Sequence, residues 1–414
     1  MKSLKLILLF VGLSMLSTSC VKDHCKKQFK MFAPIYKTMD AILKDVKLTD
    51  AKAMDKPGKI FSYGNILFVN EIDKGIHVID NTDPANPIKM GFITIDGNLD
   101  LWVKQNLLYV DCYDNLLVLD IADLHNIKVL ETMLNVFPDR NYSGYTADAN
   151  KGYIIGWQER DTTLNIDCND GGEGLMIFKS RTDIMAVDVS TSSNSSIAPT
   201  TGVAGSLTRF NMTGDYLYCV DMSNIHVFNL TQIKPVKTAD IAVGWGLETI
   251  YSYNNNLFLG TNNGVLIYSL ATPGNPTYVN KMQHVRTCDP VITDGQHAFV
   301  TLRGGSPCGG FTNQLDVLDV SDLQNVSLIK SYTLNNPWGL GMNNQYLFIC
   351  DDGYGVRVYN RGDVTQLSEI SKLAIDHPRD IIVLNNSLLI LTDKEMLQFD
   401  YSDIQQIKQV SKIN

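Results

Sequence analysis

Four acidic residues are the first candidates for chemistry, because each stands at a comparable offset ahead of a short apolar stretch. They are Asp100, Glu248, Asp289 and Asp380. If these stretches are equivalent strands of a repeated unit, the carboxylates gather on one rim. There they would focus negative potential and could hold a cation or attract a cationic ligand. The structural alternative is that acids at strand starts accept backbone N–H bonds.

Two tryptophans lie close to these acids in the sequence. Trp245-Gly246 precedes Glu248, and Trp338-Gly339 stands at a similar place in a later repeat. Exposed indole rings at a rim could stack on a sugar ring or an aromatic ligand. The alternative is that the tryptophans pack between repeats.

A second candidate site is an acidic insertion around residues 161–174. Asp167, Asn169 and Asp170 alternate with Cys168 and a glycine, and such oxygen-bearing side chains are suitable Ca²⁺ ligands. The spacing is not that of an EF-hand loop, and solvated turn residues would explain it equally well. Calcium is the only cofactor that the sequence suggests.

Cys288 and Cys308 lie in polar loops, whereas Cys112, Cys219 and Cys350 lie in or just after apolar stretches that predict strands. Their separation of 20 residues, in a compartment that permits disulfides, predicts a bond that pins a loop and contributes about 2–4 kcal/mol. Pairing of Cys168 with Cys308 is the alternative.

No recognisable catalytic motif occurs in the sequence. Gly-x-Ser-x-Gly, His-Glu-x-x-His, Cys-x-x-Cys and phosphate-cradling glycine loops are all absent. The histidines lack the spaced partners of a zinc site. We therefore assign no catalytic residue.

The elements that position these residues belong to a repeat. A five-residue motif with apolar first, third and fourth positions ends in a polar turn and predicts a strand. It occurs at 76–80, 116–120, 225–229, 265–269, 315–319, 356–360 and 396–400, mostly 40, 41 or 50 residues apart. A period of this size indicates a repeat architecture.

Each repeat reads as four strands, the motif being the third. Four antiparallel strands every 40 residues or so, without helical periodicity, predict a β-propeller and an all-β fold. Eight apolar second strands, including Tyr153-Ile154-Ile155, predict eight blades; seven is the alternative because the third repeat is irregular. Residues 407–413 supply a last fourth strand, so the ring would close without strand exchange.

Two repeats carry long insertions between their second and third strands. One follows Tyr153, and the other runs from Ala298 to Leu315. Both leave from the same kind of hairpin and must project from one face of the disc. Long loops over a propeller's mouth commonly bind ligands.

The N-terminus has the features of an export signal. Lys2 and Lys5 precede an apolar run, and Leu16-Ser17-Thr18-Ser19-Cys20 resembles a bacterial lipobox, in which the cysteine is acylated. Val21 favours the outer membrane, on either its periplasmic or its cell-surface side. We expect a signal peptide at 1–19, a lipidated tether at 20–57 with a short helix within 31–46, and the propeller at 58–414.

Charge excludes one class of partner. The full chain has a net charge of −9, and loss of residues 1–19 removes Lys2 and Lys5 but no acid, leaving 33 basic and 44 acidic residues, or −11. Nucleic acid is therefore not an expected partner.

Several blocks of the chain resemble those of LVIVD-repeat lipoproteins of Bacteroidetes. They are Pro57-Gly58-Lys59-Ile60, Gly75-Ile76-His77-Val78-Ile79-Asp80, Gly205-Ser206-Leu207-Thr208-Arg209-Phe210 and Cys308-Gly309-Gly310-Phe311. The resemblance extends from about residue 30 onwards. It implies a propeller on a lipid anchor and no established activity.

Together these features predict a lipid-anchored envelope propeller that is a non-enzymatic binding or scaffold module for a protein or glycan. The alternative is an envelope enzyme, a metal-assisted lyase or hydrolase that uses the rim carboxylates. Acids and histidines converging on one pocket would favour the enzyme, and a flat face with exposed aromatic residues would favour the binder.

Overall fold

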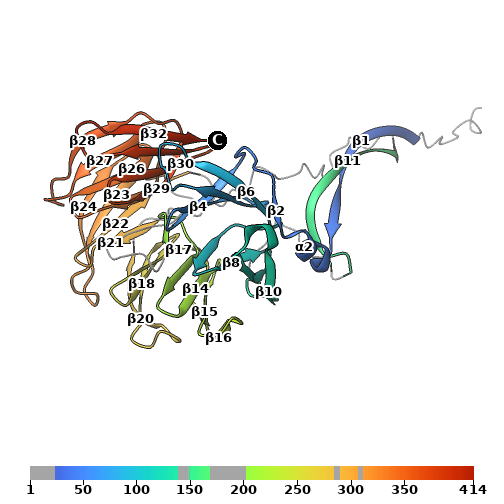
Figure 1. Ribbon diagram of the computed structural model, residues 1–414, viewed down its shortest axis with the longest axis horizontal. Coiled ribbons are helices and arrows are strands. Elements are labelled where there is room, and N and C mark those ends of the chain that lie inside the picture. The colour runs from blue at the N-terminus through green and yellow to red at the C-terminus, as the bar shows by residue number, and fades with distance from the viewer. Residues whose placement is uncertain (1–23, 139–147, 149, 168–201, 284–289, 306–310) are drawn as a thin grey trace, which may run out of the picture. The chain divides into compact units, whose positions relative to one another are not determined.

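The computed structural model describes residues 24–138, 148, 150–167, 202–283, 290–305 and 311–414. The chain divides into a small unit, residues 1–36 and 154–183, and a large unit, residues 37–153 and 184–414. The large unit contains seven β-sheets arranged as the blades of a propeller (Figure 1).

Each blade has four antiparallel strands in consecutive order. Blades 1 to 3 are β3 (Pro57–Tyr63), β4 (Ile66–Glu71), β5 (Gly75–Asp80), β6 (Ile88–Thr94); β7 (Leu101–Lys104), β8 (Leu107–Cys112), β9 (Asn115–Asp120), β10 (Lys128–Met133); and β13 (Phe210–Thr213), β14 (Tyr216–Val220), β15 (Asn224–Asn229), β16 (Val236–Ala242). A 3-10 helix, η1 (Leu124–Asn126), precedes β10.

Blades 4 to 7 repeat this arrangement. They are β17 (Leu247–Tyr253), β18 (Asn256–Thr261), β19 (Gly264–Ser269), β20 (Thr277–Gln283); β21 (Val291–Thr293), β22 (His297–Leu302), β23 (Gln314–Asp319), β24 (Ser327–Thr333); β25 (Pro337–Met342), β26 (Tyr346–Asp351), β27 (Gly355–Asn360), β28 (Ser368–Leu373); and β29 (Pro378–Val383), β30 (Ser387–Thr392), β31 (Met396–Asp400), β32 (Lys408–Ile413).

The eight-blade prediction is wrong, and the seven-blade alternative is correct. Tyr153-Ile154-Ile155 was expected to be the second strand of a blade. It instead begins β11 (Tyr153–Asp167), a long strand of the described chain that pairs with β1 (His24–Lys37) in a separate two-stranded sheet. An apolar triplet after a glycine predicts a strand, but it does not identify the strand's partner.

The ring closes by contact between blade 7 and blade 1. β29 and β30 touch β3, and Ile60 and Val69 of blade 1 share a hydrophobic cluster with Ile382 and Leu389 of blade 7. Blade 7 takes its fourth strand, β32, from its own repeat. Closure without strand exchange therefore agrees with the expectation from residues 407–413.

The blades are held together by the middle residues of the apolar second strands. Phe68, Tyr109, Tyr218, Phe258, Phe299 and Phe348 are all buried at this repeated position. Phe348 of blade 6, for example, belongs to a cluster with Ile381 of blade 7, and Phe258 of blade 4 to one with Val291 of blade 5. Burial of such a ring contributes about 2–3 kcal/mol per blade.

The polar turn after each motif strand has a repeated cause. The Asp80 carboxylate accepts the backbone N–H of Thr82 at 2.8 Å, and Asp83 accepts that of Ala85 at 3.0 Å. Asp319 and Asp322 form the same two bonds in blade 5. Side chains that bond the backbone two residues later favour turns, so these acids end the third strand and start the fourth.

Two additional strands extend blade 1. β2 (Leu48–Thr49) pairs with its outermost strand, β6, and β12 (Val203–Ala204) pairs with its innermost strand, β3. Preceding β2, the helix α2 (Met39–Asp45) buries Ile42 against the hydrophobic cluster of blades 1 and 2. The expected helix within 31–46 is thus confined to its second half, while residues 31–37 belong to β1.

Candidate functional site

The propeller has one face that collects two kinds of loop. In a four-stranded antiparallel blade, the loop from the second to the third strand and the loop into the next blade's first strand leave from the same side. We call this the upper face, and the side carrying the turns from third to fourth strands the lower face. The predicted rim belongs to the upper face.

Exposed aromatic residues mark two loops of the upper face. Trp245, in the loop from β16 to β17, is 65% exposed. It stands between Gly244 and Gly246, whose φ angles of 96° and 100° lie in the region that favours glycine. Phe311, between β22 and β23, is 99% exposed. Large exposed aromatic side chains in loops are typical of binding surfaces.

Four charged residues occupy one equivalent position at the start of the innermost strands. In each of these blades, the charged residue directly precedes the residue that pairs with the fourth residue of the second strand. The four are Lys59, Asp100, Arg209 and Asp380. They come from blades 1, 2, 3 and 7, which are consecutive around the ring. Read from blade 7 to blade 3 their charges alternate, so the four cancel.

The central channel that these residues face is occupied by the chain itself. A stretch that we call the channel segment, residues 203–209, begins with β12 on the inner edge of blade 1. The Lys59 ammonium donates to the Leu207 carbonyl at 2.6 Å, and the Ile250 N–H donates to the Thr208 carbonyl at 3.0 Å. The segment thus bonds to blades 1 and 4 through its backbone.

Side chains of the channel segment bond to three more blades. The Asp380 carboxylate of blade 7 accepts the Ser206 N–H at 2.9 Å, and the Ser206 hydroxyl accepts the Leu340 N–H of blade 6 at 2.7 Å. At the base of blade 2, Asp100 accepts the Thr208 hydroxyl at 3.0 Å and the Arg209 N–H at 2.5 Å. The segment therefore ties five blades together before it becomes blade 3.

These contacts give the position of each predicted rim carboxylate. Asp100 and Asp380 are buried and accept hydrogen bonds, as in the structural alternative stated for strand-start acids. Glu248 is half-buried and lies one residue before the equivalent position. Thr249 occupies that position, because Ile250 is the residue that pairs with Leu259, the fourth residue of β18. Asp289 lies outside the described residues. Asp100 and Asp380 thus occupy equivalent positions in blades 2 and 7, and Glu248 of blade 4 does not occupy that position.

The two tryptophans of the predicted rim differ in environment. Trp338 is only 8% exposed, and the guanidinium groups of Arg303 and Arg379 lie 3.6 and 3.9 Å from its ring centre. Two guanidinium groups this close cannot share one face of an indole, so they sandwich it. Trp338 consequently packs between blades, whereas Trp245 is free to meet a ligand.

Carboxylate–histidine and carboxylate–arginine pairs at the variable motif position were not predicted from the sequence. His77 pairs with Glu71 at 3.1 Å, His226 with Asp221 at 3.0 Å, and the Arg357 Nε with Asp351 at 2.6 Å. In each case an acid at the end of the second strand, or directly after it in the case of Asp221, faces the second motif residue of the same blade. The sequence signal was an acidic residue five or six positions before a histidine or an arginine.

The same acids hold the loops that enter the blades. Glu71 accepts the N–H groups of Asp55 and Lys56, and Asp351 accepts those of Asn335 and Asn336. Burial opposes ionisation of Glu71, but His77 and the two backbone donors outweigh it and lower the pKa of this carboxyl. Glu71 and Asp351 thus fix, through hydrogen bonds, the loops of the upper face that enter blades 1 and 6.

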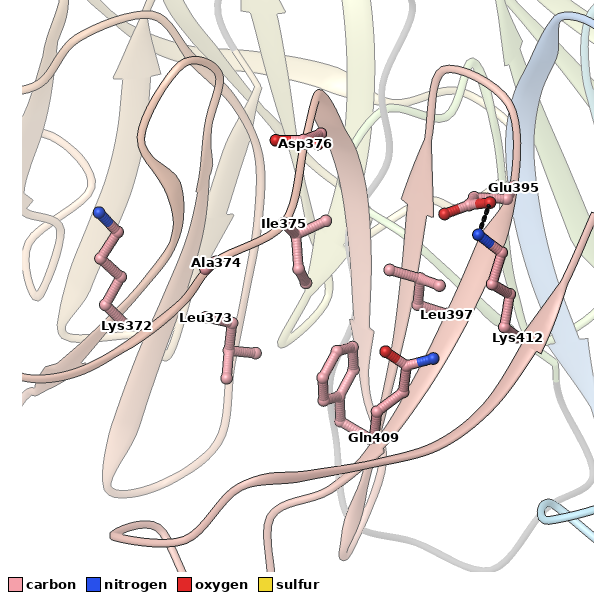
Figure 2. A pocket seen from close by; sticks show the side chains of 10 residues that line it. Lys372, Leu373, Ala374, Ile375, Asp376, Glu395, Leu397, Gln409 and Lys412 are labelled. Atoms are coloured by element: carbon pink, nitrogen blue, oxygen red, sulfur yellow. Dashed lines mark ion pairs between the residues drawn. The ribbon is translucent and has the colours of Figure 1, made fainter.

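A pocket of about 360 Å³ opens between blades 6 and 7. Leu373, Ile375, Leu397 and Phe399 form its apolar part, and Figure 2 shows Glu395 paired with Lys412 on one side and Lys372 on the other. Leu397 stands where other blades have His77, His226 or Arg357, which explains the apolar lining. Its charged groups are few and partly paired, so it is a poor candidate for catalysis.

The remaining predicted sites are only partly described. Asn169, Asp170, Cys168, Cys288 and Cys308 lie outside the described residues, and Asp167 ends β11. Calcium binding and the Cys288–Cys308 disulfide therefore stay predictions. Among the described residues no group of three metal-ligating side chains occurs. Cys112, Cys219 and Cys350 are buried, and burial raises the pKa of the Cys112 and Cys350 thiols.

Comparison with known proteins places the chain by fold. No protein-family model and no curated protein matches it. It is similar to the periplasmic gluconolactonase PpgL of Pseudomonas aeruginosa, with 11% identity over 86% of this chain and 96% of that chain and a TM-score of 0.51. A protein from Lactobacillus plantarum matches with 13% identity, 84% and 96% coverage and a TM-score of 0.51.

A third similar structure is the computationally designed Ika8 protein, with 10% identity, coverage of 89% of this chain and 90% of that chain, and a TM-score of 0.50. At these identities the likeness concerns the fold alone. The chain is a seven-bladed β-propeller whose channel holds part of its own backbone. Within the described residues, no helix has both the length and the apolar character needed to cross a membrane.

Proposed function

We propose that this propeller is a non-enzymatic binding or scaffold module of the cell envelope, with a protein or glycan as its partner on the upper face. The observation that carries the proposal is the exposure of Trp245 between two glycines of positive φ. Exposing an indole to water is unfavourable, and a partner that covers it gains about 2 kcal/mol or more.

The state of the carboxylates supports binding over catalysis. A general acid or base needs a carboxyl group that can reach the substrate and exchange a proton. Asp100 and Asp380 instead accept hydrogen bonds from Thr208, Arg209 and Ser206 of the channel segment and are buried. The enzyme alternative would have to use groups other than these two.

The anchor is part of the same proposal. The lipobox-like Leu16-Ser17-Thr18-Ser19-Cys20 supports acylation of Cys20, and the LVIVD-like motif strands support kinship with lipoproteins of Bacteroidetes. We place the protein at the outer membrane through this acyl chain. A net charge of −11 after signal removal accords with a partner other than nucleic acid.

The proposal is tested by a comparison of two matched surface variants. Trp245→Ala removes the exposed indole of the upper face, and Ile233→Ala removes a side chain of the lower face that is 60% exposed. Each protein is immobilised and offered solubilised envelope proteins in one arm and a glycan array in the other. We expect wild type and Ile233→Ala to retain one common partner that Trp245→Ala loses by tenfold or more.

Loss of that partner by Ile233→Ala, or equal retention by all three proteins, would contradict the proposal. Melting temperatures within about 3 °C of wild type show that the variants are folded, as expected for exposed positions. Retention in only one arm distinguishes a protein partner from a glycan.

A further inference from the structure

The small unit contains a two-stranded sheet with no other strand beside it among the described residues. β1 and β11 pair only with each other (Figure 1). Met31, Ile35 and Ile155 are exposed on it. An isolated two-stranded sheet is at best marginally stable in water, so a surface that covers its apolar side chains would stabilise it.

Two contacts assign the side chains to faces of this sheet. The ion pair of Lys30 with Glu159 puts these residues on one face. A Cβ atom built on Gly156 would lie 3.9 Å from the Ile35 Cδ1, which puts positions 156 and 35 on the other face. Both contacts fit one arrangement, because successive side chains alternate between faces.

The face that includes Lys30 is rich in aromatic residues. Alternation adds Lys26, Phe32 and Tyr36 from β1 and Ile155 and Trp157 from β11. We call this set the aromatic face. Of the exposed apolar side chains it includes Ile155, whereas Met31 and Ile35 lie on the opposite face. Trp and Tyr are enriched where a protein meets the headgroup layer of a membrane, since their rings are apolar with one polar atom. Lys26 and Lys30 are exposed and can contact phosphate groups, but Glu159 and Asp161 lie on the same face and balance their charge. The contact therefore depends mainly on the aromatic and apolar side chains.

The position of this sheet in the chain indicates that the surface covering it is the membrane. Only residues 21–23 separate Cys20 from His24, the first residue of β1. A chain extends by at most about 3.5 Å per residue, so an acylated Cys20 would hold the start of β1 within about 14 Å of the bilayer. Residues 24–37 of the expected tether thus form a paired strand. Because a strand advances about 3.3 Å per residue, Ile155 and Trp157, which lie beside residues 32–36, reach the headgroups when the sheet lies along the bilayer surface.

We propose that the aromatic face is a membrane-contacting surface that lies in the phospholipid headgroup layer, a proposal that rests on the proposed acylation of Cys20. Ile155 and Trp157 enter the interface, and Lys26 and Lys30 meet phosphate groups. The acyl chain brings the sheet to the bilayer, and the sheet adds a second, non-covalent contact.

Tryptophan quenching tests this contact in the acylated full chain. The protein has four tryptophans, of which Trp157 alone lies on β11. It is reconstituted in vesicles of phosphatidylethanolamine and phosphatidylglycerol whose acyl chains carry bromine near the headgroup. We expect brominated lipid to lower the emission, Trp157→Phe to abolish at least half of that decrease, and Trp245→Phe to leave it unchanged.

The opposite results separate the proposals. Equal quenching of tryptophan emission in wild type and Trp157→Phe would overturn the membrane contact. So would the absence of quenching in acylated, vesicle-bound protein. Either result would indicate that a protein partner covers the sheet instead. If mass spectrometry finds Cys20 without an acyl chain, the anchor itself fails. The contact is then tested by flotation of unacylated protein: binding lost in Ile155→Glu but kept in Ile233→Glu supports it, and no binding overturns it.

Discussion

The Asp380 carboxylate accepts the backbone N–H and the hydroxyl of Ser206, a residue 174 positions earlier in the chain. This contact joins the last blade to the channel segment. Because it fixes a loop that returns through the middle of the ring, we expect it to be important for stability.

Asp380→Asn should lower the free energy of unfolding by about 2 kcal/mol, since the buried N–H groups of Ser206 and Ile381 lose a charged acceptor. Urea unfolding measures the change. Asp376→Asn, at an exposed position on the loop before β29, is the control and should alter stability by less than about 0.5 kcal/mol. Equal effects of the two variants would show that the channel segment contributes little.

Asp221→Asn should remove stability in a pH-dependent manner. Burial opposes ionisation of Asp221, but His226 and the N–H groups of Ser223 and Asn224 outweigh it and lower its pKa. A lowered folded-state pKa contributes stability above the unfolded value of about 3.9 and loses it as pH falls through the folded value.

The difference between wild type and Asp221→Asn should therefore be about 2 kcal/mol from pH 5 to 7 and shrink below about pH 4. Urea unfolding from pH 3 to 7 gives the profile. A difference as large at pH 3 as at pH 6 would refute the role of this ionised carboxylate.

Gly355→Ala should destabilise the protein by about 3 kcal/mol. Gly355 has a φ of 121°, and a Cβ there would lie 2.2 Å from the Leu373 carbonyl oxygen of the neighbouring strand. Gly64→Ala is the matched control, because Gly64 also has positive φ but no atom within 4 Å, so only about 1–2 kcal/mol is lost. Thermal unfolding of both separates crowding from backbone strain, and similar losses would contradict the crowding.

The two tryptophans of the upper face should respond oppositely to truncation. Trp338→Ala empties a buried site between two arginines and should cost about 3 kcal/mol or more. Trp245→Ala should change the unfolding free energy by less than about 0.5 kcal/mol, because the ring is mostly in solvent. Chemical denaturation measures both, and a large loss for Trp245→Ala would mean that this residue is structural.

The repeating units could be predicted from the sequence, because their pattern is local. Each of the seven motif stretches forms the third strand of a blade, as β5, β9, β15, β19, β23, β27 and β31 show. Alternating apolar residues and an Asx turn fix such a strand within ten residues. The prediction of an eighth blade was wrong because the strand that begins at Tyr153, β11, pairs with β1, which lies more than 100 residues earlier in the chain.

The channel could not be predicted for a related reason. The block Gly205-Ser206-Leu207-Thr208-Arg209-Phe210 was recognised in the sequence, but nothing local places Ser206 beside Asp380 or Thr208 beside Asp100. The position of each predicted rim acid relative to the neighbouring strand also depends on β-bulges. Such bulges lie at the start of β17 and of β29, where the pairing register shifts by one residue. A one-residue shift sends a side chain to a different neighbour.

Photo-crosslinking in living cells tests the central claim most directly, which is that the upper face meets the partner. A photoreactive p-benzoylphenylalanine replaces Trp245 in one strain and Ile233, on the lower face, in another. Both positions are exposed, so both variants should fold. We predict one defined adduct from position 245 and none from position 233. The same adduct from both positions, or an adduct from position 233 alone, would contradict the account.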